Sequence, residues 1–155
     1  MLTNEEKFAN KVNATYENFL AKTIQRCKSE ALKEFQKLRR MQSADHLGQC
    51  VCITCKSVDH WKHFDAGHYI SRANSSTAFL PINVNPQCPY CNQHKNGALA
   101  EYREALIEKV GYLELMLLET LKDTKTPTLT KFQYAKMKNI YRLQQRETYA
   151  YKKTH

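Results

Sequence analysis

Glycine and proline are scarce in this chain, with four of each among 155 residues. Both residues interrupt helices, so their scarcity favours a mainly helical protein. Long hydrophobic runs are lacking too, and none approaches the roughly 18 residues of a membrane-spanning helix. The N-terminal sequence also lacks the apolar stretch of a signal peptide. We therefore expect a cytoplasmic protein that does not act in a membrane.

Acidic residues are in short supply as well. The chain holds 15 Asp and Glu against 24 Lys and Arg, so its net charge is +9. A small protein this basic is typical of nucleic-acid binding. Over residues 128–155, seven basic side chains accompany the single Glu147, with tyrosines interleaved. We expect phosphate contacts here, although a solvated helix face gives the same pattern. The candidate contacts are Lys131, Lys136, Lys138, Arg142 and Arg146.

The cysteines form two Cys-x-x-Cys pairs separated by 32 residues: Cys52 with Cys55, and Cys88 with Cys91. Each pair can supply one edge of a tetrahedral thiolate site, so together they predict a structural Zn²⁺. A redox dithiol is the alternative, but the βαβ context of such motifs is missing. Cys50 is a second candidate in place of Cys52, with a less suitable spacing to Cys55.

Residues 3–43 contain neither glycine nor proline, and their apolar side chains recur at steps of three and four. This periodicity predicts one long amphipathic helix, in which Cys27 is a small buried side chain. Such a helix would be about 60 Å long, more than a small zinc domain can bury. Three arrangements therefore stay open: a break into two helices, a hairpin, or a dimer.

Between the cysteine pairs, the pattern predicts strands at residues 63–70 and 79–84, joined by a polar segment. Pro81 favours an edge position for the second strand. We expect residues 45–55 to be irregular, and helices at 92–96, 99–110, 112–122 and from Thr128 onward. The fold class is thus α+β and mainly helical. Its expected divisions are a helical region at 1–45, a zinc-bound core at 46–111 and a basic helical region at 112–155.

Polar side chains able to serve hydrolysis gather in and just after the predicted hairpin. A neutral imidazole is a good general base for water, and oxygen or imidazole ligands suit Mg²⁺ or Mn²⁺. Alone, each residue is more often a hydrogen-bonded structural group, as we expect for His60 and His63. The candidates are Asp65, His68, Asn83, Asn92, His94 and Lys95.

The motifs carry a resemblance to a known family. Cys52-x-x-Cys55, Gly67-His68, Asn83 and Cys88-x-x-Cys91-Asn92 resemble the HNH (ββα-metal) nucleases. More narrowly, Ala66-Gly67-His68-Tyr69 and Gln87-Cys88-x-x-Cys91-Asn92-Gln93-His94-Lys95 resemble the lambda-type NinG (Rap) phage recombination nucleases. The resemblance implies a ββα-metal core and a structure-specific endonuclease. It would act on branched DNA such as Holliday junctions and D-loops, with structural Zn²⁺ and catalytic Mg²⁺ or Mn²⁺.

The resemblance also implies roles for individual residues. His68 matches the general base, Asn83 the residue that orients it, and Asn92 a metal ligand. One position departs from the pattern, because Gly67 stands where HNH nucleases usually have a metal-binding Asp or His. Asp65 is the nearest carboxylate, but residues 65 and 68 of a regular strand point to opposite faces. A bulge at residues 66–67 would return them to one side.

His94 is the other candidate for the catalytic metal, and Lys95 is a candidate phosphate contact. The leading hypothesis is an endonuclease of branched recombination intermediates. It would work as a homodimer through the helix at residues 3–43, with other recombination proteins as further partners. The alternatives are a non-catalytic zinc-ribbon protein that binds nucleic acid, and an interaction module built on the N-terminal helix.

Overall fold

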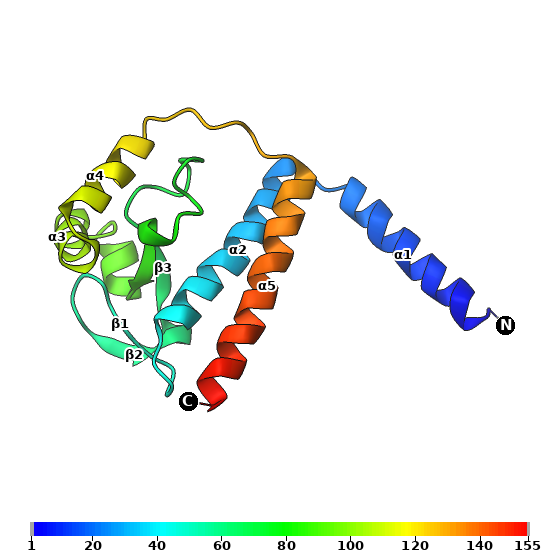
Figure 1. Ribbon diagram of the computed structural model, residues 1–155, viewed down its shortest axis with the longest axis horizontal. Coiled ribbons are helices and arrows are strands. Elements are labelled where there is room, and N and C mark those ends of the chain that lie inside the picture. The colour runs from blue at the N-terminus through cyan, green and yellow to red at the C-terminus, as the bar shows by residue number, and fades with distance from the viewer. Residues whose placement is uncertain (1, 155) are drawn as a thin grey trace.

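The computed structural model describes residues 2–154, which are mainly helical with two small antiparallel sheets (Figure 1). The short elements η1 and η2 are 3₁₀ turns, and η3 is a single π-helical turn. None of the described helices is both long and apolar enough to cross a bilayer. The order is α1 (Asn4–Leu20), α2 (Ile24–Ser43), β1 (Gln49–Val51), β2 (Val58–His60), η1 (Trp61–His63), β3 (Asp65–His68), η2 (Pro81–Asn83), β4 (Val84–Gln87), η3 (Tyr90–His94), α3 (Leu99–Val110), α4 (Tyr112–Leu121) and α5 (Lys131–Thr154).

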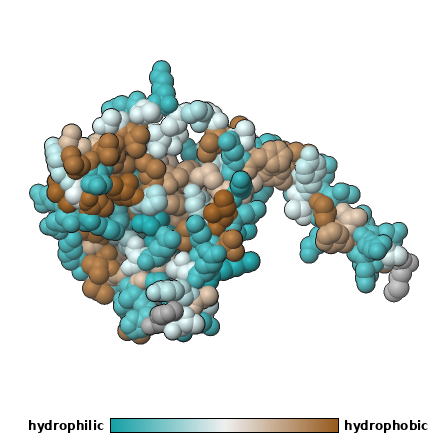
Figure 2. Space-filling model, in the orientation of Figure 1, coloured by the Kyte–Doolittle hydropathy of each residue, from teal (hydrophilic) through white to brown (hydrophobic). Residues whose placement is uncertain are grey.

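The predicted continuous helix over residues 3–43 is wrong, because α1 ends at Leu20 and α2 starts at Ile24. The side chain of Thr23 accepts a hydrogen bond from the Arg26 backbone at 3.2 Å and so caps a new helix. Of the three open arrangements, the structure has the break into two helices. Helix α1 projects from the body of the molecule, and none of its residues is buried (Figures 1 and 2).

Helices α2 and α5 lie side by side and run in the same direction (Figure 1). Lys138 Nζ donates to Glu30 at 2.9 Å, and Arg142 Nε donates to Glu34 at 2.8 Å. Both pairs join residues that are 108 positions apart, and a constant offset is the signature of parallel elements in register. These ion pairs therefore fix how the terminal helix docks.

Apolar contacts place α2 at the centre of the molecule. On one face, Cys27 and Ala31 are buried against Tyr134 of α5, which confirms Cys27 as a core residue. On another face, Phe35 packs against Val84 of the β3–β4 hairpin. The helix thus joins the C-terminal helix to the hairpin between the cysteine pairs.

The second strand of the predicted hairpin is displaced along the chain. It was expected at residues 79–84 but is β4, Val84–Gln87, because Pro81 begins the turn η2 instead. Proline suits the first position of such a turn, where no backbone N–H is needed. The hairpin register is one to one, from His68 opposite Val84 to Asp65 opposite Gln87, without a bulge.

The bounds of the remaining strands and helices can be compared directly with the predicted ones. The first strand is shorter than predicted, and a small sheet, β1–β2, begins in the segment expected to be irregular. The turn predicted at 92–96 lies at Tyr90–His94, and the terminal helix begins at Lys131 instead of Thr128. Helix α3 has the predicted bounds, and α4 ends one residue earlier.

Acid should weaken the α2–α5 contact. Hydrogen bonds from Lys22 and Lys138 lower the pKa of the Glu30 carboxyl from 4.5 to about 2. A carboxyl with a depressed folded pKa stabilises the fold above pH 4.5, and this contribution is lost as the pH falls towards 2. Glu30→Gln should lower the free energy of unfolding by about 1 kcal/mol at neutral pH. Urea unfolding of both proteins from pH 7 to pH 2 measures this difference in the free energy of unfolding.

The difference between the wild type and Glu30→Gln should shrink towards zero at the acid end of this series. The matched control is Glu104→Gln, which changes an exposed glutamate of α3 with no ion pair to another described residue. A Glu30→Gln effect that stays constant from pH 7 to 2 would contradict the ion-pair explanation.

Candidate active site and metal centre

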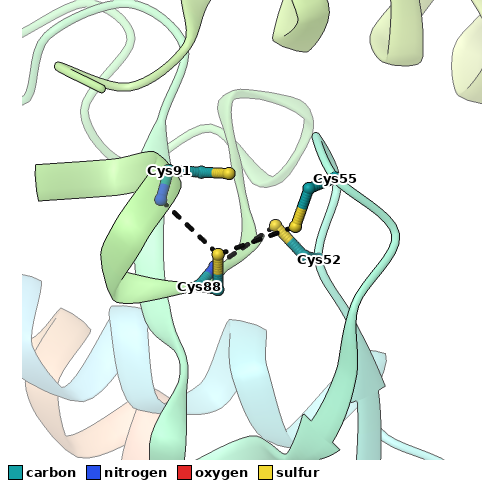
Figure 3. Close-up of side chains that lie close together, drawn as sticks. All are labelled: Cys52, Cys55, Cys88 and Cys91. Atoms are coloured by element: carbon teal, nitrogen blue, oxygen red, sulfur yellow. Dashed lines mark hydrogen bonds between the residues drawn. The ribbon is translucent and has the colours of Figure 1, made fainter. Parts of the chain in front are cut away.

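Two turns bring four cysteine side chains to one point, as Figure 3 shows. The sulfur atoms of Cys52, Cys55, Cys88 and Cys91 all lie within 4.8 Å of one another. The sulfurs of Cys55 and Cys88 are 3.7 Å apart. A tetrahedral Zn²⁺ with bonds of about 2.3 Å to sulfur separates its ligands by roughly 3.8 Å. The four cysteines are therefore positioned to hold a metal ion, and they fit structural zinc.

Hydrogen bonds prepare part of this site for a metal. Burial works against ionisation, but the Cys88 backbone N–H at 3.3 Å and the Thr54 hydroxyl at 3.2 Å lower the pKa of the Cys52 thiol to about 6. A hydrogen bond with the Ser57 hydroxyl lowers the pKa of Cys55. Because thiolates are the ligands that zinc prefers, these contacts favour binding.

Cys50 does not belong to the metal centre. Its thiol is buried and donates to the Arg40 carbonyl at 3.3 Å, and burial raises its pKa to about 11. Of the alternatives that the sequence left open, the structure places Cys52 in the cluster. Within residues 2–154, the four cysteines are the only group of three or more His, Cys, Asp or Glu side chains arranged to hold a metal.

A polar cleft of about 480 Å³ lies between α2, β3 and η3. It brings together Asp65, His68 and Asn92, three residues that the sequence analysis singled out. Helix α2 and the loop after β3 supply further side chains. The full lining is Gln36, Arg40, Asp65, Ala66, His68, Ser71, Arg72, Asn92 and Gln93.

Asp65 and His68 share this cleft although the strand between them is regular. The bulge expected as a condition for their meeting is not there, because every residue of β3 has one partner in β4. The two residues stand at opposite ends of a four-residue strand, and both line the cleft. Asp65 Oδ2 accepts hydrogen bonds from Asn92 Nδ2 at 2.9 Å and Gln93 Nε2 at 2.8 Å.

Gly67 faces the protein interior. A Cβ atom at this position would lie 2.3 Å from Gln87 Oε1 and 2.9 Å from Gln87 Cβ, so a side chain does not fit. Gln87 is fully buried, and its Nε2 donates to the Gly97 carbonyl at 2.7 Å. This contact explains the departure from the HNH pattern, since position 67 cannot offer a ligand while Gln87 fills the space. The carboxylate in the cleft belongs to Asp65.

The His68 imidazole is partly buried. Burial lowers its pKa and so favours the neutral form, and hydrogen bonds with the Ala78 and Ala66 backbone offset part of this effect. The Ala78 carbonyl lies 3.1 Å from Nε2 and can only accept, so Nε2 carries the proton. In the neutral ring, Nδ1 is then the unprotonated nitrogen and can act as a base.

Asn83 braces the loop that holds His68. Its side chain is fully buried, and its Oδ1 accepts from the Ile70 N–H at 2.7 Å. Its Nδ2 donates to the carbonyls of Ile70 at 2.9 Å and Thr77 at 3.0 Å. Thr77 precedes Ala78, whose carbonyl accepts from His68. Asn83 therefore acts on the imidazole only indirectly, by holding the residue next to the one that binds His68, and its side chain does not line the cleft.

The structure places other candidate residues outside the cleft. The centre of the His94 ring lies 6.0 Å from that of the Tyr90 ring, and Lys95 Nζ lies 5.5 Å from the centre of the same Tyr90 ring. Both side chains therefore group around one exposed tyrosine. His63 Nδ1 is 2.9 Å from Asp59 on the surface. Of the described residues, Asp65, His68 and Asn92 are therefore the sequence candidates for catalysis or catalytic-metal binding that line the cleft.

Sequence reasoning missed the residues of α2 and the loop. Gln36 and Arg40 lie in the N-terminal helical region, and no local pattern connects them with His68. Arg72 follows the strand by only four positions, and its charge was the one available signal. These residues become neighbours only because α2 packs on the hairpin.

Comparison with known proteins identifies the family. The family described as "Bacteriophage Lambda NinG protein" matches residues 3–152. The chain belongs to the NinG family. Protein ninG of Salmonella phage P22 is 43% identical over 61 residues, which are 39% of this chain and 30% of the relative. Protein ninG of Escherichia phage lambda is 41% identical over 61 residues, 39% of this chain and 29% of the relative.

The NinG relatives are therefore matched over less than a third of their own length. Protein ninG of Enterobacteria phage H19B is 45% identical over 49 residues, which are 31% of this chain and 24% of the relative. No solved structure matches the chain.

The basic terminal helix of this NinG-family chain is partly engaged within the fold. Lys138 and Arg142 pair with glutamates of α2, and Lys131 Nζ donates to the Leu20 carbonyl at 2.9 Å. Lys136 and Arg146 are exposed and form no ion pair with another described residue. Phosphate contact by this helix stays a prediction, and these two side chains are the most available for it.

The metal centre of this NinG-family protein can be tested with a matched pair of variants. Cys88→Ser should lose stoichiometric zinc and unfold or aggregate, because metal binding contributes directly to the folding of a small domain. Cys50→Ser should retain zinc, since Cys50 is buried nearby but is no ligand. Metal analysis and thermal melting of protein purified without chelators measure both effects. Wild-type protein without zinc would refute the assignment.

Proposed function

We propose that the protein is a metal-dependent, structure-specific endonuclease that hydrolyses a phosphodiester bond in branched recombination intermediates, such as Holliday junctions or D-loops. The observation that carries the proposal is an oriented His68 that shares one polar cleft with the Asp65–Asn92 pair. Membership of the NinG family and the resemblance to HNH nucleases support it. The named relatives are phage proteins, so we expect the reaction in the cytoplasm of the bacterial host.

In this proposal, His68 Nδ1 removes a proton from the water that attacks phosphorus, and the 3′ oxygen departs. The Nε2–H···O bond to Ala78 strengthens as the imidazole becomes positive, because a charged donor forms a stronger hydrogen bond. It also prevents the ring from rotating. Asn83 contributes indirectly by holding the neighbouring Thr77 carbonyl.

Asp65 and Asn92 are the residues that would hold a catalytic Mg²⁺ or Mn²⁺. Carboxylate and amide oxygens are hard donors, which these ions prefer, so the donor set fits. The bound ion would act as a Lewis acid that stabilises the departing oxygen. The amides of Asn92 and Gln93 hold the Asp65 carboxylate in a defined orientation in the cleft.

The decisive variant is His68→Ala. It should bind DNA close to the wild-type level and retain zinc, while its cleavage rate falls on the order of 10²–10⁴-fold, because positioned proton transfer is lost. Labelled four-way, forked and linear DNA with Mg²⁺ or Mn²⁺ provide the assay. His46→Ala, which removes an exposed histidine, is the control.

Asn92→Ala should fail differently, through weaker metal binding, and should be partly rescued by more Mn²⁺. A His68→Ala protein that cuts at the wild-type rate would refute this role. If the wild type binds DNA but cuts no substrate under any metal condition, the non-catalytic zinc-ribbon function replaces the proposal.

We also infer that α1 pairs with α1 of a second copy. Phe8, Val12, Tyr16 and Leu20 recur at every fourth position and are between 41% and 70% exposed. An isolated helix of this length is only marginally stable in water, so we expect its exposed apolar face to pack against a partner. Helix α1 stands clear of the body in Figure 2, which leaves that face accessible.

Charged residues flank this apolar face. On a helical projection, Lys11 falls on one side of it, whereas Glu6 and Glu17 fall on the other. A pair of copies can therefore set Lys11 of one helix against a glutamate of its partner. A homodimer also supplies the two active sites that symmetric cutting of a four-way junction needs.

The dimer can be tested by removing the apolar face of α1. The double variant Phe8→Ser with Tyr16→Ser should sediment as a monomer at concentrations where the wild type is a dimer, and should retain zinc. The control is Leu113→Ser, which changes an α4 side chain of similar exposure, 71% against 70% for Phe8. A wild-type protein that is monomeric at every concentration, or a variant that still dimerises, would contradict the pairing.

A further inference from the structure

The cleft around His68 contains two arginines with different surroundings. Arg40 of α2 is half-buried, donates to the Phe64 carbonyl at 2.7 Å and lies 5.8 Å from the Trp61 ring centre. Arg72, on the loop after β3, is exposed. In the part of the chain that the structure describes, it forms no hydrogen bond or ion pair. Arg40 is thus committed to the fold, whereas the guanidinium of Arg72 is available to a ligand.

The loop that carries Arg72 is anchored on both sides of that residue. The Asn74 backbone N–H donates to the Ser71 carbonyl at 2.9 Å, which closes a turn around Arg72. The Asn74 side chain donates to the Lys122 carbonyl at 2.6 Å, and the Ser76 hydroxyl donates to the Leu121 carbonyl at 2.7 Å. These bonds fasten the loop to the end of α4, so the Arg72 backbone is held at the rim of the cleft.

The charges of the cleft suit an anion that carries a single phosphate group. Two guanidinium groups oppose one carboxylate, that of Asp65, and the remaining lining is polar or small. The charge of Arg72 also reaches the imidazole, because after burial it is the other influence that lowers the pKa of His68. A planar guanidinium without an internal partner is well matched to two phosphate oxygens.

We propose that Arg72 binds the phosphodiester that His68 acts on, and that the anchored loop sets its position. This inference rests on the proposed function, because it takes a nucleic-acid strand as the occupant of the cleft. The guanidinium would contact the non-bridging oxygens of the phosphate, where negative charge builds up as water attacks. Its interaction therefore strengthens in the transition state, so Arg72 affects the rate of cleavage as well as binding.

The test compares Arg72→Gln and Arg72→Lys in full-length, zinc-loaded protein. Binding of a labelled four-way junction is measured without added Mg²⁺ or Mn²⁺ over a series of salt concentrations. Arg72→Gln should reduce the magnitude of the slope of log affinity against log salt by about one, because one phosphate contact is lost. Arg72→Lys should keep the slope. The control Arg26→Gln removes an equal charge from an exposed site at the start of α2, and it should leave cleavage unchanged.

Single-turnover cleavage at saturating DNA is the second readout. Arg72→Gln should lower the rate about 10²–10³-fold, the effect typical of a lost transition-state donor, and lysine should restore only part of it. An unchanged salt slope overturns the phosphate contact, whatever the rate. An unchanged rate with a smaller slope overturns the transition-state role. If the wild type cuts no DNA but Arg72→Gln still lowers the slope, the endonuclease fails while the phosphate site stands.

Discussion

The convergence of four cysteine sulfurs is the constraint on which the candidate site depends. Cys52 and Cys55 precede β3, and Cys88 and Cys91 follow β4, so one cluster holds both ends of the segment that carries the hairpin. The hairpin strands have only four residues each, and such short strands are not stable alone. A metal at this point would restrict the hairpin without a large hydrophobic core.

Helix α2 provides the second half of the arrangement. It packs on the hairpin through Phe35 and Val84, and on α5 through a parallel contact with paired charges. It also contributes Arg40 to the cleft, where that side chain binds the carbonyl just before Asp65. The basic terminal helix therefore packs on the helix that lines the cleft, and two of its positive charges are paired within the fold.

The cleft shows how a departure from a motif follows from packing. Gly67 leaves room for the buried Gln87, whose amide reaches the Gly97 carbonyl near the start of α3. A ligand at position 67 would have to displace this contact. Asp65 lies in the cleft, and the amides of Asn92 and Gln93, from the turn that contains Cys91, donate to its carboxylate. The metal centre and the cleft are thus adjacent through η3.

The sequence by itself determined the features that depend on local spacing. The cysteine pairs, the helices at 99–110 and 112–121, and the hairpin at His68 follow from patterns of a few residues, which local geometry obeys. Two local signals, the capping bond of Thr23 and the turn that Pro81 begins, overrode hydrophobic periodicity and set the break between α1 and α2 and the position of β4. Only the tertiary structure decided the entry of Arg40 and Arg72 into the cleft. The cleft arginines come from segments far apart in the sequence, and it is the packing of α2 on the hairpin that makes them neighbours.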